Sequence, residues 1–353
     1  MGIIKKYFHI RKVNRQISKY KYVHLMFNDK FNKPFVDFIN RNFDSKEHLF
    51  LCHKWFDEFP MPKGDNVISS WNYATVKLKS KHIKKIICHS LFDGIIVDYL
   101  YKNQDILKEK ALWLIWGGDL YEAIRDKKND FVRANFMGYI SGTDGDCEVA
   151  MQKYNSHPKT YNASYTFPIT KEMLDKSKRA GHDYVQIQIN NSCNSSTLEI
   201  FDVLSKFRNK NIKITTILSY GQMEYKDVII KKGQEIFGEK FQYLDKYLTP
   251  SEYAQYLAQN DILILNQNRQ QGVGNCFSNL ALGSKVFIKS EITTYNHFNL
   301  KGIRVFDTNE IKDMTFEDFI SYSEEIKQTN MQRALIFFDD TYLKELWKKV
   351  FNE

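Results

Sequence analysis

The sequence predicts an α/β protein made of two Rossmann-like units. Its 353 residues are too many for one typical domain and suit two of roughly 150–180 residues. Short apolar runs alternate with helical patterns along most of the chain, which is typical of βα units around a parallel sheet. The alternation stops near Pro168 and starts again at residue 184, so we expect one unit on each side of that break.

The first unit is predicted over residues 22–166. Four short apolar runs indicate buried strands, and a weaker run after them indicates a fifth. Helical spacing between the runs, as in FVDFINRNF (35–43), completes the βα pattern. The runs are YVHLMF (22–27), HLFLCH (48–53), KKIICHS (84–90), ALWLIWGG (111–118) and GYISGTDGD (138–146).

The second unit is predicted over residues 184–330, after a polar connector at 167–183. Ser251 is expected to cap its third helix and Gly283 to end its fourth, and the last segment, 331–353, has a helical pattern of its own. Two such units are expected to face each other across a cleft, where ligands bind beyond the carboxyl ends of the strands. Strands are expected in 184–192, 211–221, 261–267 and 285–290, and helices in 196–207, 224–238, 251–260 and 275–283.

The amino-acid composition excludes some classes of protein but does not identify the binding partner. A net charge of +9 favours anionic partners without choosing among nucleic acid, phosphorylated metabolites and anionic membranes. The five cysteines are scattered with no CxxC pair, which argues against a zinc ribbon and fits a reducing compartment. The sequence shows neither an apolar run of transmembrane length nor the apolar stretch of a signal peptide, so it predicts a cytoplasmic protein.

Residues 1–21 form a basic N-terminal arm. The arm carries seven Lys and Arg residues and no acid, with apolar residues between them. Such a segment can lie on an anionic membrane surface, or it can be a solvated terminus. A second basic stretch, KLKSKHIKK (77–85), would favour the membrane if it lay on the same face.

A glycine turn, RQQGVGN (269–275), separates a predicted strand from a predicted helix. Gly272 and Gly274 would let the backbone turn sharply and approach a ligand, and the helix start at Asn275 would offer free N–H groups to a diphosphate. Arg269 adds a forked, charged donor. The alternative is an ordinary βα turn. The turn is neither GxGxxG nor a P-loop, which argues against hydride transfer and nucleotide hydrolysis.

A second polar turn, INNSCNSS (189–196), follows the first strand of the second unit. Asn191, Ser192 and Asn194 either bind a phosphate or sugar there or cap the next helix.

Acids follow a glycine pair in WLIWGGDLYE (113–122) of the first unit. Asp119 is a candidate general base on an acceptor hydroxyl or a sugar-binding group; alternatively it caps a helix, with Glu122 as its capping-box partner. Asp144-Gly145-Asp146 has a metal-binding DxD form, but we interpret it as a helix start and predict no metal site.

Polar residues also end two other predicted strands of the first unit. His89 ends the third strand, and Asn28 and Asp29 end the first. Strand ends of one parallel sheet converge, so these side chains are candidates for the same edge as Asp119, although each alone can equally be structural.

Three of these stretches resemble a known family, the bacterial 4-acetamido-4,6-dideoxygalactose (Fuc4NAc) transferases of enterobacterial common antigen synthesis. WLIWGGDLYE (113–122) is similar to the family's W-x-I-W-G-x-D-L-Y-E, and TFPI (166–169) is similar to its F-P-T segment. NQNRQQGVGNCFSNLALG (266–283) is similar to its A-R-Q-Q-G-x-G-x-L-x-x-x-I-x-x-G. The INNSCNSS turn is a looser match.

The resemblance implies a GT-B fold and a glycosyltransferase that uses no metal or other cofactor. It implies a dTDP-linked amino-deoxysugar donor and a saccharide acceptor on undecaprenyl diphosphate at the inner face of the membrane. The matching positions imply donor-binding roles for Asn191, Ser192, Asn194, Arg269, Gln271, Gly272, Gly274 and Asn275. They leave Asp119, Glu122 and His89 as catalytic candidates, and Asn28 and Asp29 as acceptor-binding candidates.

Three alternatives stay open beside this reading. The first is another nucleotide-sugar glycosyltransferase of the same fold that makes capsule or O-antigen. The second is a non-catalytic anion-binding protein, and the third is an epimerase of GT-B shape. Nucleic-acid binding is not expected, because the basic residues concentrate in the arm and in 77–85 rather than with aromatic residues on one face.

Overall fold

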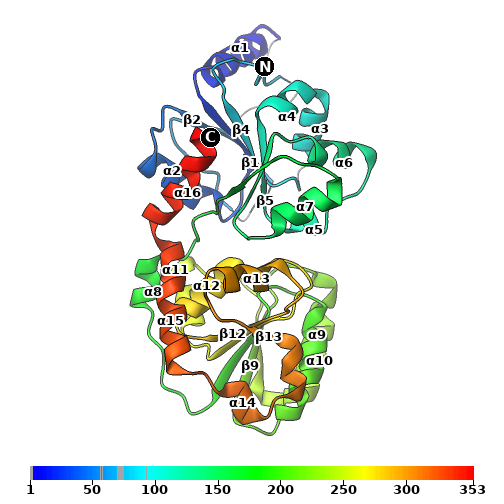
Figure 1. Cartoon of the computed structure of the whole chain (residues 1–353), viewed down its shortest axis with the longest axis vertical. Helices are drawn as coiled ribbons and strands as arrows, with labels where there is room; N and C mark the ends of the chain where they lie inside the picture. The colour runs from blue at the N-terminus through cyan, green and yellow to red at the C-terminus, as the bar shows by residue number, and fades with distance from the viewer. Residues whose placement is uncertain (1–2, 56, 58, 70–74, 93) are drawn as a thin grey trace. The chain divides into compact units, whose positions relative to one another are not determined.

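The computed structural model describes residues 3–55, 57, 59–69, 75–92 and 94–353. The chain divides into two compact units (Figure 1). The first unit consists of residues 1–168 together with 340–353, and the second of residues 169–339. Each unit is built around its own parallel sheet.

The sheet of the first unit has seven parallel strands in the order β3-β2-β1-β4-β5-β6-β7. The five predicted strands are present. The sequence did not indicate β3 and β7, which lie at the two edges; β3 has two residues, and three of the four residues of β7 are exposed. The strands are β1 (Tyr22–Phe27), β2 (His48–His53), β3 (Val67–Ile68), β4 (Lys85–His89), β5 (Ala111–Ile115), β6 (Gly138–Ser141) and β7 (Lys159–Asn162).

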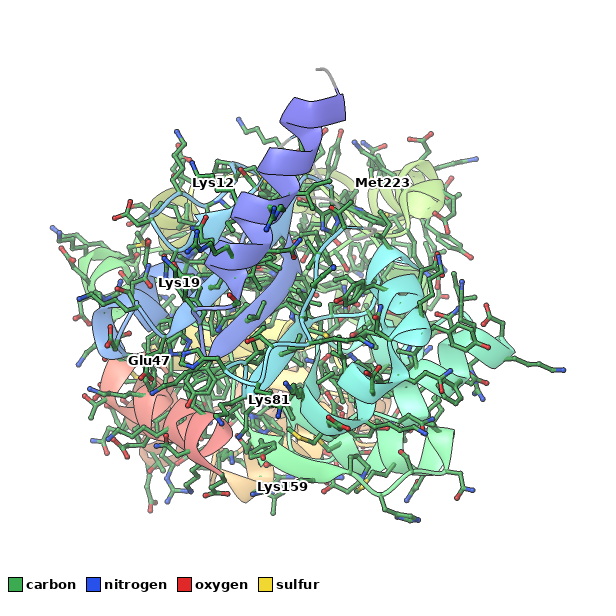
Figure 2. All side chains as sticks on the ribbon, turned by 90° about the horizontal axis from the view of Figure 1, so that it is seen from above. Lys12, Lys19, Glu47, Lys81, Lys159 and Met223 are labelled. Atoms are coloured by element: carbon green, nitrogen blue, oxygen red, sulfur yellow. The ribbon has the colours of Figure 1, made fainter. Side chains whose placement is uncertain are left out.

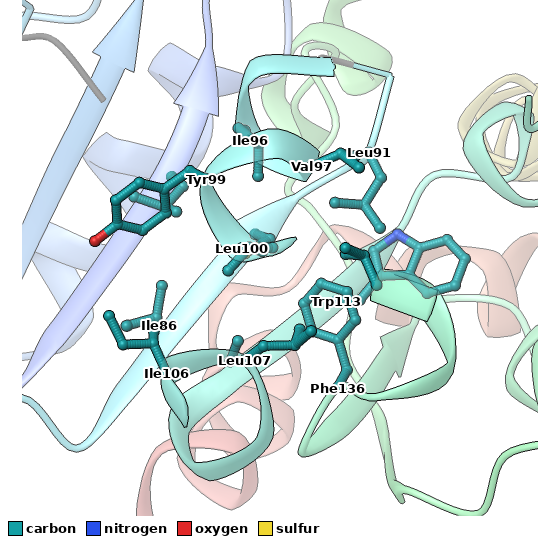
Figure 3. Close-up of a cluster of buried hydrophobic side chains, with 14 of the residues drawn as sticks. Ile86, Leu91, Ile96, Val97, Tyr99, Leu100, Ile106, Leu107, Trp113 and Phe136 are labelled. Carbon is teal, nitrogen blue, oxygen red and sulfur yellow. The ribbon is translucent and has the colours of Figure 1, made fainter. Parts of the chain in front are cut away.

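Helices cover both faces of this sheet. Because both faces are buried, the sequences of its central strands are unbroken apolar runs. Alternate residues of β1 enter different cores: Val23 and Leu25 pack on one face, Tyr22 and Met26 on the other. Figure 3 shows part of the first core, where α3 and α4 pack over β4 and β5. The helices are α1 (Ile3–Ile17), α2 (Asn32–Asn42), α3 (Gly94–Lys102), α4 (Gln104–Lys110), α5 (Gly118–Tyr121), α6 (Lys127–Ala134) and α7 (Asp146–Tyr154).

The last helix of the chain, α16 (Asp340–Asn352), returns to the first unit and closes its second core. Trp347 is fully buried there, with its ring 5.0 Å from that of Phe35, and its indole nitrogen donates to the carbonyl of Ser164 at 2.9 Å. The prediction of a single helical segment over 331–353 is therefore wrong. Its first residues end α15 in the second unit, and the chain breaks at 336–339 before α16.

The second unit has six parallel strands in the order β10-β9-β8-β11-β12-β13. The four predicted strands are present. The short strands β10 and β13 were not predicted, since each has only two to four residues and is largely accessible. The strands are β8 (Val185–Ile189), β9 (Ile212–Ile217), β10 (Phe241–Leu244), β11 (Ile262–Leu265), β12 (Lys285–Ile288) and β13 (Phe306–Asp307).

Two predicted helix starts in the second unit are corrected by the structure. The cap of α11 is Thr249, whose hydroxyl accepts from Glu252 in a capping box, rather than Ser251. Helix α12 begins at Val273, two residues before the predicted start. The helices are α8 (Lys171–Lys176, inside the predicted connector), α9 (Ser196–Leu204), α10 (Lys226–Phe237), α11 (Pro250–Leu257), α12 (Val273–Ala281), α13 (Thr293–Leu300), α14 (Phe316–Ile320) and α15 (Glu324–Leu335).

Candidate functional site

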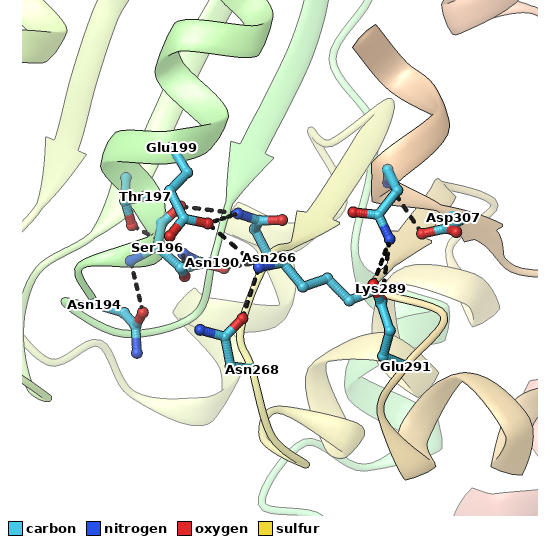
Figure 4. Close-up of polar contacts among 11 residues, drawn as sticks. Asn190, Asn194, Ser196, Thr197, Glu199, Asn266, Asn268, Lys289, Glu291 and Asp307 are labelled. Atoms are coloured by element: carbon cyan, nitrogen blue, oxygen red, sulfur yellow. Dashed lines mark hydrogen bonds and ion pairs between the residues drawn. The ribbon is translucent and has the colours of Figure 1, made fainter. Parts of the chain in front are cut away.

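In the second unit the two predicted polar turns meet, because they follow the neighbouring parallel strands β8 and β11. Asn190 joins them from a left-handed backbone conformation with φ 53°. Its Oδ1 accepts from the backbone N–H of Asn266 at 2.9 Å, and its Nδ2 donates to Thr197 at 2.9 Å (Figure 4). This fully buried asparagine thus ties the turn after β8, the start of α9 and the turn after β11 into one structure.

Two glutamines after β11, of which Gln271 belongs to the glycine turn, bind the INNSCNSS turn directly. Gln267 Nε2 donates to Asn191 Oδ1 at 2.8 Å, and Gln271 Nε2 donates to Ser192 Oγ at 2.8 Å. Within the described ranges, the Oε1 atoms of both glutamines are buried and accept no hydrogen bond. Buried acceptors normally have a donor, so these two oxygens are suited to the polar hydrogens of a bound ligand.

The backbone conformation and the close packing at position 272 both require a glycine. Its φ is +72°, and a Cβ placed there would lie 2.6 Å from Nδ2 of Asn191. Gly272 is also the N-cap residue of α12, and no side chain caps that helix start. The first N–H groups of α12 therefore have no helical partner, which is the arrangement that favours an anion.

Gly274 has a different role from the one predicted. It lies in the first turn of α12 and has no positive φ, so the sharp turn depends on Gly272 alone. Asn275 lies in the same first turn. Arg269 Nη1 donates to the carbonyl of Gln270 at 2.9 Å, which holds its guanidinium beside the turn.

Asn194 supports the start of α9, since its Oδ1 accepts from the backbone N–H of Ser196 at 2.9 Å. Asn194 acts from the position before the N-cap of α9, which is Ser195 and makes no side-chain cap hydrogen bond.

The structure adds a cation that the sequence did not single out. Lys289 directly follows β12, with its side chain 15% exposed. Its Nζ donates to Asn268 Oδ1 at 2.6 Å and pairs with Glu199 at 3.3 Å (Figure 4). Because β12 neighbours β11, this lysine belongs to the same strand-end edge as the glycine turn. Its position directly after an apolar predicted strand is the sequence feature that could have identified Lys289 as a candidate.

In the first unit Asp119 joins two strand ends. Its carboxylate accepts from the backbone N–H groups of Leu91 and Trp116, both at 2.9 Å, and from the indole of Trp113 at 2.7 Å. Burial raises the pKa of Asp119, while these three donors oppose that rise. With both oxygens engaged inside the unit, Asp119 holds the ends of β4 and β5 together. A role for Asp119 as general base stays a prediction.

The predicted capping box of Asp119 and Glu122 is wrong. The N-cap of α5 is Gly117, with φ 92° and no side-chain cap, and Glu122 is exposed at the end of that one-turn helix. Glu122 stays an untested catalytic prediction.

Asn28 and Asp29 lie at the carboxyl end of β1 as predicted, and both hold local backbone. Asn28 is fully buried; its Nδ2 donates to the carbonyl of Phe59 at 2.6 Å and its Oδ1 accepts from the N–H of Trp55 at 2.5 Å. Asp29 accepts from the N–H of Phe31 at 3.0 Å, and burial raises its pKa. An acceptor-binding role for either residue stays a prediction.

His89 is part of a buried chain of rings. Its Nε2 lies 2.9 Å from Nδ1 of His24, and Nε2 of His24 lies 3.2 Å from Nδ1 of His48. At the other side, Nδ1 of His89 contacts the hydroxyl of Tyr165. Sequence reasoning missed His24 and His48 because both occupy ordinary inward positions of apolar strands.

Both acids of the Asp144–Asp146 pair contact other side chains of the first unit. Asp144 accepts from the side chain of Asn162 at 2.6 Å, and Asp146 begins α7 and accepts from the hydroxyl of Tyr121 at 2.7 Å. Across the described part of the chain, no three His, Cys, Asp or Glu side chains are grouped so as to hold a metal ion.

Solved structures of other proteins share the fold of this chain. Sucrose-phosphate synthase from Thermosynechococcus elongatus aligns with a TM-score of 0.68 at 8% identity, covering 94% of this chain and 98% of that one. The trehalose 6-phosphate synthase of Burkholderia multivorans aligns at 0.66 and 7%, covering 95% and 98%. A UDP-N-acetylglucosamine 2-epimerase described as putative, from Listeria monocytogenes, aligns at 0.57 and 9%, covering 93% and 94%. At these identities the likeness establishes the fold, which is GT-B.

The family follows from the sequence itself. The family model for the 4-alpha-L-fucosyltransferases, glycosyl transferase group 56, matches residues 67–353. The chain therefore belongs to this family and is a glycosyltransferase. Among curated proteins, none matches it.

The two glycines of the turn give a matched test of this geometry. Gly272→Ala should lower the free energy of unfolding by about 1–2 kcal/mol, because a left-handed alanine is strained and its Cβ displaces Asn191. Gly274→Ala should be neutral or stabilising, because it adds a better helix former to α12. Urea unfolding of the two variants measures both effects, and equal stabilities would contradict the assignment.

The buried histidines predict acid sensitivity of the first unit. Burial lowers the pKa of His48 and His89 to about 3, whereas an unfolded histidine titrates near 6.5. Between these values the unfolded state binds protons that the folded state does not. The stabilisation is therefore complete above pH 6.5 and is lost as the pH falls toward 3. Each group adds a slope of up to about 1.4 kcal/mol per pH unit.

Unfolding free energies at pH 7, 5.5 and 4.5 test this slope. His48→Gln should reduce it, whereas the exposed His82→Gln should leave it unchanged. The same slope in both variants would show that other groups cause the acid loss.

Proposed function

We propose that this glycosyltransferase moves a deoxyamino sugar of the Fuc4NAc type from a dTDP-sugar to a saccharide carried on undecaprenyl diphosphate. The observation that carries the proposal is the strand-end cluster of the second unit. It combines an uncapped helix start, a left-handed Gly272, and the two buried, unsatisfied oxygens of Gln267 and Gln271. Together these offer N–H groups to a diphosphate and acceptors to the rest of a nucleotide sugar.

The donor-binding assignments follow from this cluster. The N–H groups of Val273, Gly274 and Asn275 would receive the diphosphate, and Arg269 would add a charge-assisted contact. Sugar transfer leaves negative charge on the departing diphosphate, and donors fixed in advance stabilise that charge as it develops. The other assigned donor-binding residues are Asn191, Ser192, Asn194, Gln271 and Gly272.

The acceptor side is assigned to the carboxyl-end edge of the first unit. His89, Asn28 and Asp29 end strands of that sheet, and Asp119 fixes the ends of β4 and β5. Glu122 is exposed near the same edge, where it could contact an acceptor. Another nucleotide-sugar donor on the same machinery is the second candidate, because the fold is shared with synthases and epimerases of different chemistry.

A thermal-shift panel of dTDP-, UDP- and GDP-sugars tests the donor. A ligand that binds the folded state raises its apparent stability by mass action, so the dTDP-sugar should give the largest shift. Arg269→Ala should reduce dTDP affinity tenfold or more, since a charge-assisted contact contributes about 1.5–3 kcal/mol. Arg208→Ala, an exposed arginine before β9, is the control. A larger shift with UDP or GDP would replace the proposed donor.

We also propose that the protein is peripheral on the inner face of the membrane. The two basic stretches lie together at the amino ends of the adjacent strands β1 and β4, where the N–H of Lys84 donates to the carbonyl of Lys21 at 2.8 Å. Asn14 of α1 bonds to Thr75 and Lys77 at 2.8 and 2.7 Å. Figure 2 shows the labelled Lys12, Lys19 and Lys81 on this end of the unit. Their common face is what supports contact with anionic lipid.

Membrane contact predicts a charge-dependent sedimentation with anionic vesicles. No helix within the described ranges is long and apolar enough to cross a bilayer. Replacing four exposed lysines of this face by Gln should lower the partition coefficient a hundredfold or more, at about 1 kcal/mol for each cation. Four exposed lysines of the second unit serve as the control, and equal losses in both variants would remove the proposal. The test set is Lys12, Lys19, Lys77 and Lys81; the control set is Lys210, Lys231, Lys246 and Lys312.

A further inference from the structure

Four hydrogen-bonding rings form an unbroken path along one face of the first sheet. His48 is the first residue of β2, His24 is the third of β1, and His89 is the last of β4. The ring centroid of His24 lies 5.5 Å from that of His48 and 5.2 Å from that of His89. Tyr165 continues the path beyond His89. The path therefore runs from the carboxyl-end edge of the sheet to its amino-end edge.

The two ends of the path lie in different surroundings. Tyr165 is half-buried at the carboxyl-end edge, packed against Phe31 and Trp116 with ring centroids 5.9 and 5.4 Å away. His48 lines a pocket of ≈ 210 Å³ between the start of β2 and α16. Because its Nδ1 is engaged by His24, its Nε2 is the nitrogen that remains for exchange with water in that pocket.

The middle of the path allows only neutral rings. His24 is enclosed by Phe35, Phe50 and Phe351, and burial followed by the two neighbouring histidines keeps its pKa well below its ordinary value. A neutral imidazole carries one N–H and one acceptor nitrogen. Each ring can therefore donate to only one neighbour. All hydrogen bonds of the path must then be donated in the same direction, either toward His48 or toward Tyr165.

A change from one direction to the other moves the proton of every ring to its other nitrogen, which amounts to the net transfer of one proton along the path. In one, Tyr165 donates to His89, His89 to His24 and His24 to His48, so the oxygen of Tyr165 can only accept from groups outside the path. In the other, every donor is reversed and Tyr165 presents its proton outward. Switching between them carries one proton from the carboxyl-end edge to the pocket without leaving any ring charged.

We propose that this path removes the hydroxyl proton of the sugar acceptor, with Tyr165 in contact with the acceptor and His89, His24 and His48 passing the proton to the pocket. The inference rests on the proposed function. The acceptor oxygen bonds to the anomeric carbon, and the bond from that carbon to the diphosphate breaks with its electron pair on the diphosphate. The acceptor proton moves to Tyr165, the proton of Tyr165 moves to His89, and His48 releases a proton from Nε2.

The path resets after the product leaves. A proton returns from pocket water to Nε2 of His48, the donors reverse again, and Tyr165 gives its outward proton to water. No ring has to rotate, which suits side chains that are packed this closely.

Among the described residues, the charged and titratable groups that act on the path from outside do so at its two ends. Asp29, Asp119 and Cys52 act on Tyr165, Asp44 acts on His48, and Tyr22 packs on His48 at 4.8 Å. The pocket itself is also lined by Glu47, Lys344 and Lys348, which surround the proton's exit.

His24→Gln tests the path in the full-length enzyme. Glutamine keeps a donor and an acceptor in place of the imidazole but cannot exchange one for the other. We expect kcat to fall a hundredfold or more, the KM for the donor to stay within twofold, and the solvent isotope effect to change. Phe50→Leu, which loosens packing on the same ring without breaking the path, should keep the wild-type isotope effect and pH profile. A folded His24→Gln enzyme with wild-type kcat would overturn the proposal.

A readout without turnover separates this inference from the proposed function. In protein labelled with ¹⁵N-histidine, Tyr165→Phe should change the Nδ1 and Nε2 shifts of His48, because the directions of all rings are coupled. Changes that stop at His89 would overturn the path even in an active enzyme. Wild-type protein that transfers no sugar from any donor of the panel, yet shows this coupling, would refute the function while supporting the coupled path.

Discussion

Both sheets depend on one constraint: the backbone groups at the carboxyl ends of buried parallel strands must find partners where the regular ladder stops. In the first unit the buried carboxylate of Asp119 binds the N–H of Leu91 after β4 and that of Trp116 after β5. In the second unit Asn190 does the same for Asn266 after β11 while holding the start of α9. These two side chains fix the strand-end loops, and the candidate site residues of each unit lie on or beside those loops.

The sequence predicted the elements whose burial leaves a simple pattern. Central strands such as β1 and β4 are covered on both faces, so they read as continuous apolar runs. The edge strands β3, β7 and β13 have two to four residues and accessible positions, so they carry no such signal. The amphipathic pattern of α16 identified a helix but not its partner, since the same apolar stripe could have covered either unit.

Prediction of the candidate site was limited in a different way. Glycine and small polar residues marked the two turns of the second unit correctly, but the pattern could not show that only Gly272 needs its left-handed backbone or that Gln267 bridges the turns. His24 and His48 occupy inward positions where an apolar residue would fit the same pattern. Their relation appears only when the register of β1, β2 and β4 brings the rings together.

The shared fold and the low identity together mean that the fold alone does not define the reaction. Two sugar-phosphate synthases and an epimerase align over more than nine tenths of this chain at 7–9% identity, so the sheets alone cannot determine the reaction. The candidate site residues of this chain lie at the strand ends of its two sheets. In this chain the second unit supplies neutral amides and an uncapped helix start. The first unit supplies a buried set of neutral rings that ends at Tyr165. The carboxylate of Asp119 lies at the same edge, and its two oxygens already accept from three donors of that unit.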